Sequence, residues 1–571
     1  PKPIIIGEGD YIEPNRYFKI GSFNREADNP KSLFDPKVNG LDFFECLEGM
    51  LVEIREGISV GGNDENNEIP VLSHYGKNAT NRSIGGGLIL AEDYSDFNPE
   101  VLTISDYIIK YKDYKTGDRF LAPIRGIVDY SYKRYKIFNT ESLPEVESTL
   151  EKEHSAISKS ENKLTICSYN IENFAPLNTP NGSIVKTEGI ADDIVNRLFC
   201  PDIIGLVEVQ DNSGNMDLGD ASCDKTLNEL IEAIEKNPSN TAKYKYRYIN
   251  PIYGTEGGEP VGNIRVVFIY NQNRVTFVDK PTDIERNNDK ELMKKLPEKS
   301  VELINKNGKL ELSLNPGRID PLNPDFSATR KSLAGEFIFK GEKVFIILNH
   351  LSAKGGDEAL GGRFHPPIFK SEEKRVKQAK IINDFVQKML NIEEKANIIV
   401  IGDYNDFHFS ETLKTIKGNI LTNLIEKLPV NDRYSYLYQG NSQILDNILV
   451  SKNILSKKPE IDIVHCNAEY SYNLNFTDHD PVISAFTFGD EVIDKVEPVF
   501  YKDYPKNNYK KCFELPLMVK LNKTGRIYYA GFISESYKPT NSEIKSGFYG
   551  DTTPIDIKGI LNQLPPAKQV V

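Results

Sequence analysis

An acid and an amide follow a short apolar run in the second half of the chain, and their spacing could support chemistry. Residues 398–401 (Ile-Ile-Val-Ile) predict a buried strand, and Gly402 then leads to Asp403 and Asn405. Because alternate side chains of an extended chain point the same way, these two should leave the strand end together. Such loops often carry binding or catalytic groups, although a polar turn would use the same residues. The rest of the chain has to decide between the two interpretations.

Other polar side chains stand at the ends of further predicted strands. They are Asn170, Glu208, His350, Asp446, Asp478 and His479. If these strands belong to one sandwich of sheets, the groups converge on one rim together with Asp403 and Asn405. Carboxylate and amide oxygens suit Mg²⁺, Mn²⁺ or Ca²⁺ rather than zinc, and the set contains no cysteine. Taken singly, each has an ordinary explanation, such as a surface turn at Asp478–His479 or a cap at Asp446.

Length and composition describe an ordinary multidomain protein. The 571 residues are too many for one core, and 39% hydrophobic with 27% charged residues is usual for a globular chain. The net charge of −13 argues against a broad basic surface for nucleic acid, but not against a site where bound cations supply the positive charge. No apolar run is long enough to span a membrane. The six cysteines show no zinc spacing, and they allow disulfides without requiring them.

Shifts in composition predict four parts of the chain. Residues 1–140 contain short strand-like runs separated by Gly, Asn and Pro, which predicts a β-rich domain of the barrel or sandwich type. Within it, the acid-rich segment 62–68 is predicted to be a solvated loop. A polar linker follows at 141–162. Residues 163–490 alternate strand-like runs with helical patterns, which predicts one large α/β domain.

The last part, 491–571, is basic and aromatic. Residues 501–571 carry eleven Lys and Arg against six acids, with a predicted hairpin turning at Asn522–Gly525. Such a tail could stack on nucleic acid, or it could be a small β appendix of the catalytic domain.

Six motifs resemble those of the endonuclease/exonuclease/phosphatase superfamily and occur in the same order across 163–490. They are Ser168-Tyr-Asn-Ile, Leu206-Val-Glu-Val-Gln, Leu348-Asn-His-Leu, Ile401-Gly-Asp-Tyr-Asn-Asp, Leu445-Asp-Asn-Ile-Leu-Val and Thr477-Asp-His-Asp-Pro. Additional stretches resemble secreted bacterial extracellular nucleases and extend the likeness towards residue 1. These are Leu41-Asp-Phe-Phe-Glu-Cys-Leu-Glu-Gly-Met-Leu-Val, Gly126-Ile-Val-Asp-Tyr-Ser-Tyr, Val209-Gln-Asp-Asn-Ser-Gly, Gly262-Asn-Ile-Arg-Val-Val-Phe-Ile-Tyr and Gly362-Arg-Phe-His-Pro-Pro. Residues 491–571 resemble no known family.

The resemblance implies an architecture and a set of roles. The expected fold is a four-layer α/β sandwich of the DNase I-like type, with an N-terminal OB-like barrel and a small C-terminal β appendix. Glu208, Asn170 and Asp478 would hold Mg²⁺, with Mn²⁺ or Ca²⁺ as alternatives. The remaining roles are water activation by Asp403 with Asn405, transition-state stabilisation by His479 paired with Asp446, and phosphate contacts by His350, Arg330, Asn263 and Arg265.

The expected activity is metal-dependent hydrolysis of DNA, with RNA as a second substrate and little sequence preference. A phosphatase or phospholipase of the same superfamily is the first alternative, and a non-enzymatic binding protein is a distant one. Vertebrate pancreatic deoxyribonuclease has arginines two residues after its metal-binding Asn and Glu, where this chain has Glu172 and Gln210. Reading of the minor groove by that route is therefore not expected. A secreted or periplasmic location is expected from the resemblance alone, with any signal peptide outside this sequence.

Overall fold

The computed structural model describes residues 2–17, 34–92, 94–219, 221–280, 298–362, 364–365, 367–489 and four strands beyond them (506–507, 517–518, 525–531 and 555–564). Pro1–Ser155 and Lys163–Gly489 form one compact unit, and Ala156–Asn162 with Asp490–Val571 form another. The first unit contains a β-rich region and an α/β region.

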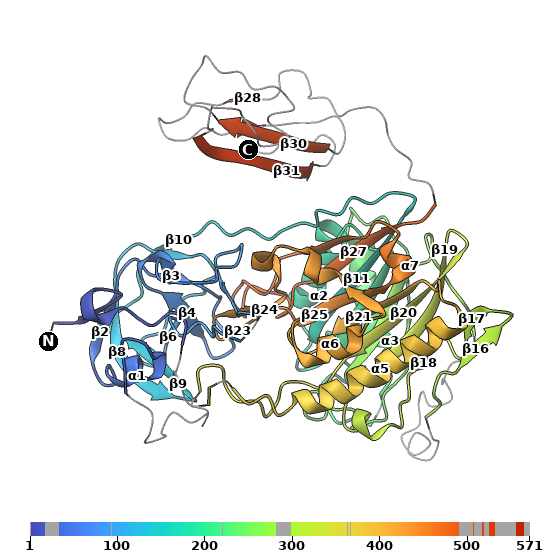
Figure 1. Cartoon of the computed structure of the whole chain (residues 1–571), viewed down its shortest axis with the longest axis horizontal. Coiled ribbons are helices and arrows are strands. Elements are labelled where there is room, and N and C mark those ends of the chain that lie inside the picture. Colours follow the sequence, from blue (N-terminus) through green and yellow to red (C-terminus); the bar gives the residue numbers. More distant parts are fainter. Residues whose placement is uncertain are drawn as a thin grey trace. The chain divides into compact units, whose positions relative to one another are not determined.

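Two sheets make the centre of the α/β region (Figure 1). The first has the order β13 (Tyr244–Arg247), β14 (Arg265–Asn271), β12 (Ile203–Val209), β11 (Lys163–Phe174), β27 (Val482–Thr487) and β26 (Glu460–Ile463). The second has the order β15 (Thr276–Phe277), β19 (Leu333–Phe339), β20 (Glu342–His350), β21 (Ile398–Asp403), β25 (Asp446–Ser451) and β22 (Leu421–Asn423), with β18 (Gly317–Arg318) beside β19.

The two sheets pack face to face through one apolar core. Ile166 and Val207 of the first sheet share this core with Leu348 and Ile401 of the second. The sheets approach so closely at Gly205 that an added Cβ would lie 2.6 Å from Leu348 Cδ1 and 2.8 Å from Ile401 Cδ1. Long apolar runs produce such strands because both of their faces are buried.

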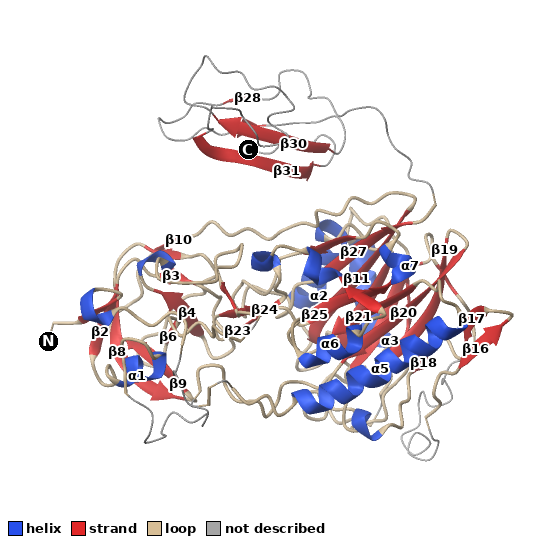
Figure 2. Cartoon of the chain, in the orientation of Figure 1, coloured by secondary structure: helices blue, strands red, loops and turns tan. Residues whose placement is uncertain are grey.

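Helices cover the outer faces of both sheets (Figure 2). On the second sheet, α5 (Glu372–Ile392) and α6 (Glu411–Lys417) share a separate core with Ile347 and Val400. On the first, α2 (Ile184–Asp192) runs into a π-helical turn whose Asp193 accepts a hydrogen bond from Tyr169 of β11 at 2.7 Å. The remaining helices are α3 (Asp224–Lys236) and α7 (Lys452–Leu455). The predicted four-layer α/β sandwich is confirmed.

The β-rich region is built on one nine-stranded sheet. Its order is β1 (Ile4–Ile6), β2 (Leu51–Ile54), β8 (Ile124–Ser131), β9 (Arg134–Asn139), β6 (Leu102–Ser105), β4 (Glu68–Leu72), β3 (Ile58–Ser59), β7 (Arg119–Phe120) and β10 (Val146–Glu147), with the short helix α1 (Gly40–Glu45) alongside. Residues such as Val52, Ile69 and Ile104 form its core. The strands make a path with β1 and β10 at its ends, so the barrel closure expected from the sequence has no support here.

The β-rich region is joined to the α/β region by a shared small sheet. Its β5 (Leu88–Ile89) pairs in parallel with β24 (Asn441–Gln443), which pairs with β23 (Tyr436–Tyr438). Asn98 donates to the Asn441 side chain at 2.7 Å beside this junction. These are backbone and buried polar contacts, so the two regions are one packed body rather than two linked ones.

The acid-rich segment 62–68 takes part in the same junction, which corrects the prediction that it is simply a solvated loop. Only its tip, Glu65–Asn66, is exposed. Glu68 is buried and bound by Arg134 and Lys136, and Asn63 accepts a backbone hydrogen bond from Tyr472 at 2.9 Å.

Several other sequence predictions can be compared with the described residues. None of the five described cysteines forms a disulfide, and no described helix is long and apolar enough to cross a membrane. The turn of the predicted C-terminal hairpin lies outside the described residues. The strands described around it pair differently, β28 (Lys506–Asn507) with β29 (Leu517–Met518) and β30 (Gly525–Gly531) with β31 (Ile555–Leu564).

Gly62, at the junction between the two regions, should not tolerate a larger side chain. A Cβ added at Gly62 would fall on the backbone of Tyr470 and Ser471, which cannot move aside like the end of a side chain. We expect Gly62→Ala to destabilise the protein by about 1–3 kcal/mol, seen as a lower Tm. Gly355→Ala is the matched control, because a Cβ there meets nothing within 4 Å. Equal Tm values for the two variants would contradict the described junction.

The buried carboxyl group of Glu100 predicts a dependence of stability on pH. Burial, together with the charges of Asp96 and Glu13, raises its pKa from 4.5 to about 8. Between these two values the folded state keeps a proton that the unfolded state has lost, so stability should fall as pH rises through this window. Glu100→Gln should therefore raise Tm more at pH 8 than at pH 5, whereas Glu147→Gln at an exposed position should not. A constant Tm difference across the pH range would refute this assignment.

Candidate active site

Strand direction brings the predicted site residues to one edge. β11 runs parallel to β12, and β20 runs parallel to β21, so Asn170, Glu208, His350 and Asp403 lie at or near strand ends on the same side. β25 is antiparallel to β21 and therefore begins at this edge, with Asp446 paired to Asp403 in register. Loops and side chains at the carboxyl ends of parallel strands are where α/β proteins place their sites.

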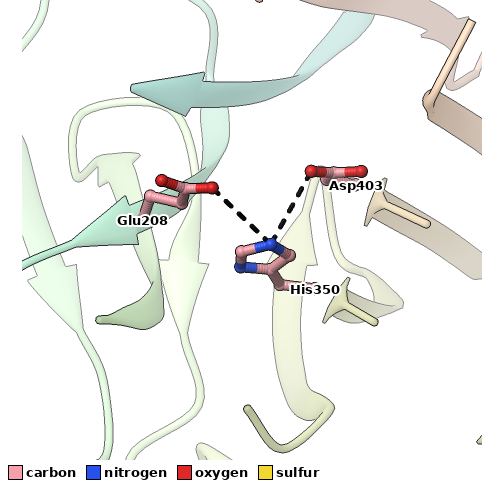
Figure 3. A group of neighbouring side chains, drawn as sticks. All are labelled: Glu208, His350 and Asp403. Carbon is pink, nitrogen blue, oxygen red and sulfur yellow. Dashed lines mark ion pairs between the residues drawn. The ribbon is translucent and has the colours of Figure 1, made fainter. Parts of the chain in front are cut away.

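Two carboxylates and a histidine meet there (Figure 3), and the amide of Asn170 joins them. Nε2 of His350 lies 3.7 Å from Glu208 Oε1 and 3.7 Å from Asp403 Oδ2. The amide nitrogen of Asn170 donates to the same two oxygens, at 3.2 Å and 3.1 Å respectively. The two sheets are thus linked at their edge through Asn170 and Asp403.

Register shifts in the strand pairing lie beside Asn170 and Glu208 and affect the direction of their side chains. The β11–β12 pairing shifts after Asn170, and the β12–β14 pairing shifts between Leu206 and Val209, which bracket Glu208. Glu208 has a φ of 65° and Asn405 a φ of 52°, values that non-glycine residues seldom adopt. Such irregularities and strain are concentrated at functional sites.

His350 is a neutral imidazole in a fixed orientation. Arg330 Nε donates to its Nδ1 at 3.1 Å, so the hydrogen of the neutral ring is on Nε2, which faces the carboxylates. Burial, with the positive charges of Arg330 and His479, lowers the pKa of His350 well below its usual value. The orientation of His350 is therefore set by an arginine, Arg330.

His479 has the opposite protonation state. Its Nδ1 lies 2.6 Å from Asp446 Oδ2, which also accepts from Ser435 Oγ at 2.7 Å. Burial opposes a charge on His479, but the negative charges of Asp446, Asp478 and Asp403 outweigh it and raise the pKa well above the usual value. The two histidines are therefore one neutral N–H donor and one imidazolium at the same site.

Asp403 is held by its own loop. Its Oδ1 accepts from the backbone N–H of Asn405 at 2.7 Å, and the Asn405 side chain donates to the Leu351 carbonyl at 3.2 Å. Burial and the charge of Asp446 raise the pKa of Asp403 to about 7. Gly402 is required before it, because its φ is 136° and an added Cβ would collide with the Asn349 carbonyl.

The donor set fits a hard divalent cation. Glu208, His350 and Asp403 form the one group of three such side chains, among the described residues, whose ligand atoms all lie within 4.8 Å. The lone pair of His350 Nδ1 accepts a hydrogen bond from Arg330, so the ligand atoms in this group are the oxygens of Glu208 and Asp403. The N–H₂ group of Asn170 donates to both of these oxygens. Carboxylate oxygens concentrated in this way suit Mg²⁺, Mn²⁺ or Ca²⁺.

Asp478 lies outside this group of three. Its Oδ1 is 3.9 Å from His479 Nε2, and its side chain is 39% exposed. Burial, partly offset by His479 and reinforced by Glu172 and Glu208, raises its pKa to about 7. Asp403 lies next to Glu208, and the expected role of Asp478 as a metal ligand stays a prediction.

The two weaker phosphate-binding candidates have other partners. Asn263 donates to Asp211 at 2.7 Å, and Arg265 donates to the Asn250 side chain at 2.6 Å and to the Asn263 carbonyl at 2.7 Å. Arg265 is 2% exposed. These hydrogen bonds connect Arg265 to the loop beside the rim, and its expected contact with a phosphate stays a prediction. Arg330, by contrast, touches His350 and the Leu351 carbonyl.

Sequence reasoning missed Tyr436. Its ring centroid lies 4.8 Å from that of His479, and an isolated bridge pairs the two backbones. The alternation Tyr434-Ser-Tyr-Leu-Tyr438 was the available signal, because it places aromatic side chains on one face of a short strand. The same run contains Ser435, the second partner of Asp446.

Comparisons with known proteins give two family matches. Residues 264–469 match the model described as the Endonuclease/Exonuclease/phosphatase family, and residues 5–148 match a domain of unknown function. No curated protein matches the chain.

Three of the solved structures that are similar to this chain illustrate the match. Humanized D. rerio TDP2 is 15% identical and covers 57% of this chain and 99% of its own, with a TM-score of 0.35. The human Nocturnin catalytic domain is 16% identical; the match covers 57% of this chain and 95% of that domain, with a TM-score of 0.34. An endonuclease/exonuclease/phosphatase from Bacteroides vulgatus is 12% identical; the match covers 57% of this chain and 99% of that protein, with a TM-score of 0.32.

The TM-scores lie below 0.5, so the assignment depends on the matched sequence model together with the ordered motifs. Three of the six motifs lie within residues 264–469, and the resemblance predicted from the motifs is confirmed at the level of the superfamily. Residues 264–469 thus match the endonuclease/exonuclease/phosphatase family, whose members hydrolyse phosphate esters, and the ordered motifs of the α/β region agree with that match.

Proposed function

We propose that this protein is a metal-dependent phosphodiesterase that acts outside the cell as an endonuclease of low sequence preference, with DNA as its main substrate and RNA as a second. The observation that carries the proposal is the meeting of Glu208, Asp403, neutral His350 and protonated His479 at one edge of the sandwich. Phosphate ester hydrolysis needs these groups together, whereas a binding protein does not.

Glu208, Asn170 and Asp478 would hold the divalent cation, with Asp403 beside them. For Asn170 this requires the amide oxygen to face the cation in place of the N–H₂ group that donates to Glu208 and Asp403. When bound there, the cation would offset negative charge on the phosphate that approaches these carboxylates. Glu208 and Asp403 repel one another in the absence of such a charge, and the amide of Asn170 is the nearest neutral compensation.

Asp403 is the group to deprotonate water. Its pKa of about 7 is close to the value at which a carboxylate is both ionised and able to accept a proton. The water oxygen then attacks phosphorus, its proton passes to Asp403 Oδ2, and the bond from phosphorus to the leaving oxygen breaks. Asn405 binds the other carboxylate oxygen, and Oδ2, which accepts one hydrogen bond from Asn170, has a further lone pair for the proton.

The two histidines would stabilise the charge that grows on phosphorus oxygens. His350 offers the Nε2 hydrogen as a neutral donor, and Arg330 prevents the ring from turning. His479 contributes a full positive charge because Asp446 stabilises the imidazolium. Preorganised donors of this kind are usually the largest contribution to such catalysis.

A phosphatase or phospholipase activity is the second candidate. The same four groups would hydrolyse an inositol phosphate, a sphingomyelin-type diester or a nucleotide, because the reacting phosphorus is the same. The similarity of the N-terminal stretches to extracellular nucleases favours nucleic acid.

Cleavage of supercoiled plasmid tests the proposal. We expect nicking in Mg²⁺, loss of nicking in EDTA, and a fall in rate of about 10²- to 10⁴-fold for Asp403→Asn, because the variant cannot accept the proton. Asp384→Asn, on the exposed face of α5, is the matched control and should keep full activity. RNA and an inositol phosphate assayed in parallel rank the alternatives. Absence of nicking in Mg²⁺, Mn²⁺ and Ca²⁺ alike would reject the DNA nuclease.

Arg330→Lys tests whether His350 must be held in one tautomer. Lysine keeps the positive charge but has no Nε to donate to Nδ1, so we expect kcat/KM to fall by about 10- to 100-fold. Nitrogen-15 NMR of the histidines should show the fixed Nε2–H tautomer in the wild type and a mixture in the variant. Arg125→Lys, on an exposed strand, is the control. An unchanged tautomer with unchanged kinetics would remove Arg330 from the site.

A further inference from the structure

A row of aromatic rings leads away from the proposed catalytic histidine. Tyr436 and Tyr438 lie two apart on β23, so both side chains leave the same face of the strand. The Tyr436 ring lies 4.8 Å from His479, and the Tyr438 ring lies 6.5 Å from that of Tyr436 with an angle of 11° between planes. Tyr438 is 47% exposed, so its outer face is open.

These rings line a cavity of about 250 Å³ that adjoins the catalytic site at Tyr436 and Asp478. Glu172 and Asp478 line its inner end, and Tyr472 lines another side with 52% of its surface exposed. The facing wall is supplied by the β-rich region through loop 62–68. The backbone of Tyr472 is tied to this loop at Asn63, so the walls are held together.

The charge of the cavity disfavours a second phosphate, although one of its carboxylates, Glu172, is paired with Lys186 at 3.0 Å. Asp64, Glu65, Glu172 and Asp478 all line it. The one basic side chain in the lining, Arg134, is already bound by Glu68 and, at 3.5 Å, by Asp64. Carboxylates repel an anion but accept hydrogen bonds from a neutral group that carries N–H donors.

We propose that this cavity is a subsite for the nucleobase next to the scissile phosphate, stacked on Tyr438 and Tyr472 and hydrogen-bonded to the acidic side chains of the wall. This rests on the proposed nuclease function and gives the β-rich region, residues 5–148, a role in binding substrate. A flat heterocycle with N–H groups on its edge satisfies both the rings and the carboxylates. The volume is below the roughly 300–1,000 Å³ usual for drug-sized ligands and suits one base or nucleoside.

The subsite should favour single-stranded over duplex nucleic acid. A base can enter the cavity only when it is unstacked from its neighbours, which is easy in a single strand or at an end and costly inside a duplex. The acidic wall likewise stops the sugar-phosphate chain from continuing into the cavity. Single-stranded or frayed nucleic acid is therefore the favoured substrate.

Dinucleotides with and without a base test the subsite. In the wild type, replacing one nucleoside of a dinucleoside monophosphate by an abasic residue should lower kcat/KM about tenfold or more on one side of the phosphate. The penalty should shrink in Tyr438→Leu and Tyr472→Leu, and it should persist in Tyr438→Phe, which keeps the ring. Tyr107→Leu, at a tyrosine that is 79% exposed and outside the cavity, is the matched control. An equal penalty in the wild type and both leucine variants overturns the proposal.

Binding of adenosine tests the subsite without hydrolysis. Saturation-transfer NMR should detect adenosine bound to the wild type and to Tyr438→Phe, and little to Tyr438→Leu. If adenosine binds but neither plasmid nor dinucleotide is cleaved, the nuclease proposal fails and the subsite remains. If nucleic acid is cleaved but adenosine does not bind, the subsite is wrong and the nuclease proposal remains. Saturable binding of choline in place of adenosine also overturns it, because the acids and rings then hold a cationic group.

Discussion

Glu208 and Asp403 come from different sheets, yet their carboxylate oxygens share one space with a single imidazole N–H and a single amide. Two like charges this close are unfavourable unless a proton, a cation or several donors compensate them. The structure shows the partial compensation: Asn170 donates to both, and the pKa of Asp403 rises to about 7 as burial and Asp446 disfavour its charged form. The contacts of the two histidines around this site are arranged to keep Glu208 and Asp403 together.

The two histidines show how one site holds opposite electrostatic roles. Arg330 places a positive charge against His350 and takes its lone pair, which keeps the ring neutral. Asp446 places a negative charge against His479, which keeps that ring charged. Because Asp446 also lies opposite Asp403 in the sheet register, one carboxylate sustains the imidazolium and makes Asp403 harder to ionise. A substitution of Asp446 would therefore alter both the charge of His479 and the pKa of Asp403.

The strands and their polar ends could be predicted from the sequence because buried strands require apolar runs and a site requires polar residues where the runs end. β21, β20 and β12 follow this rule, and so does the sandwich that they build. The pairing of Arg330 with His350 could not be predicted, since it joins a loop to a strand end through tertiary packing alone. The position of Glu208 beside Asp403 depends on register shifts that leave no mark in composition.

Segment 62–68 shows why the β-rich region was harder to interpret. Its acids suggest a solvated loop, but Gly62 packs on the α/β region and Glu68 neutralises Arg134 and Lys136 inside the fold. Burying Glu68 there without these cations would be costly, so its charge is part of the packing. The same loop presents its remaining acids to the cavity beside Asp478. The junction between the two regions therefore determines both the stability of the β-rich region and the charge that a substrate meets next to the catalytic edge.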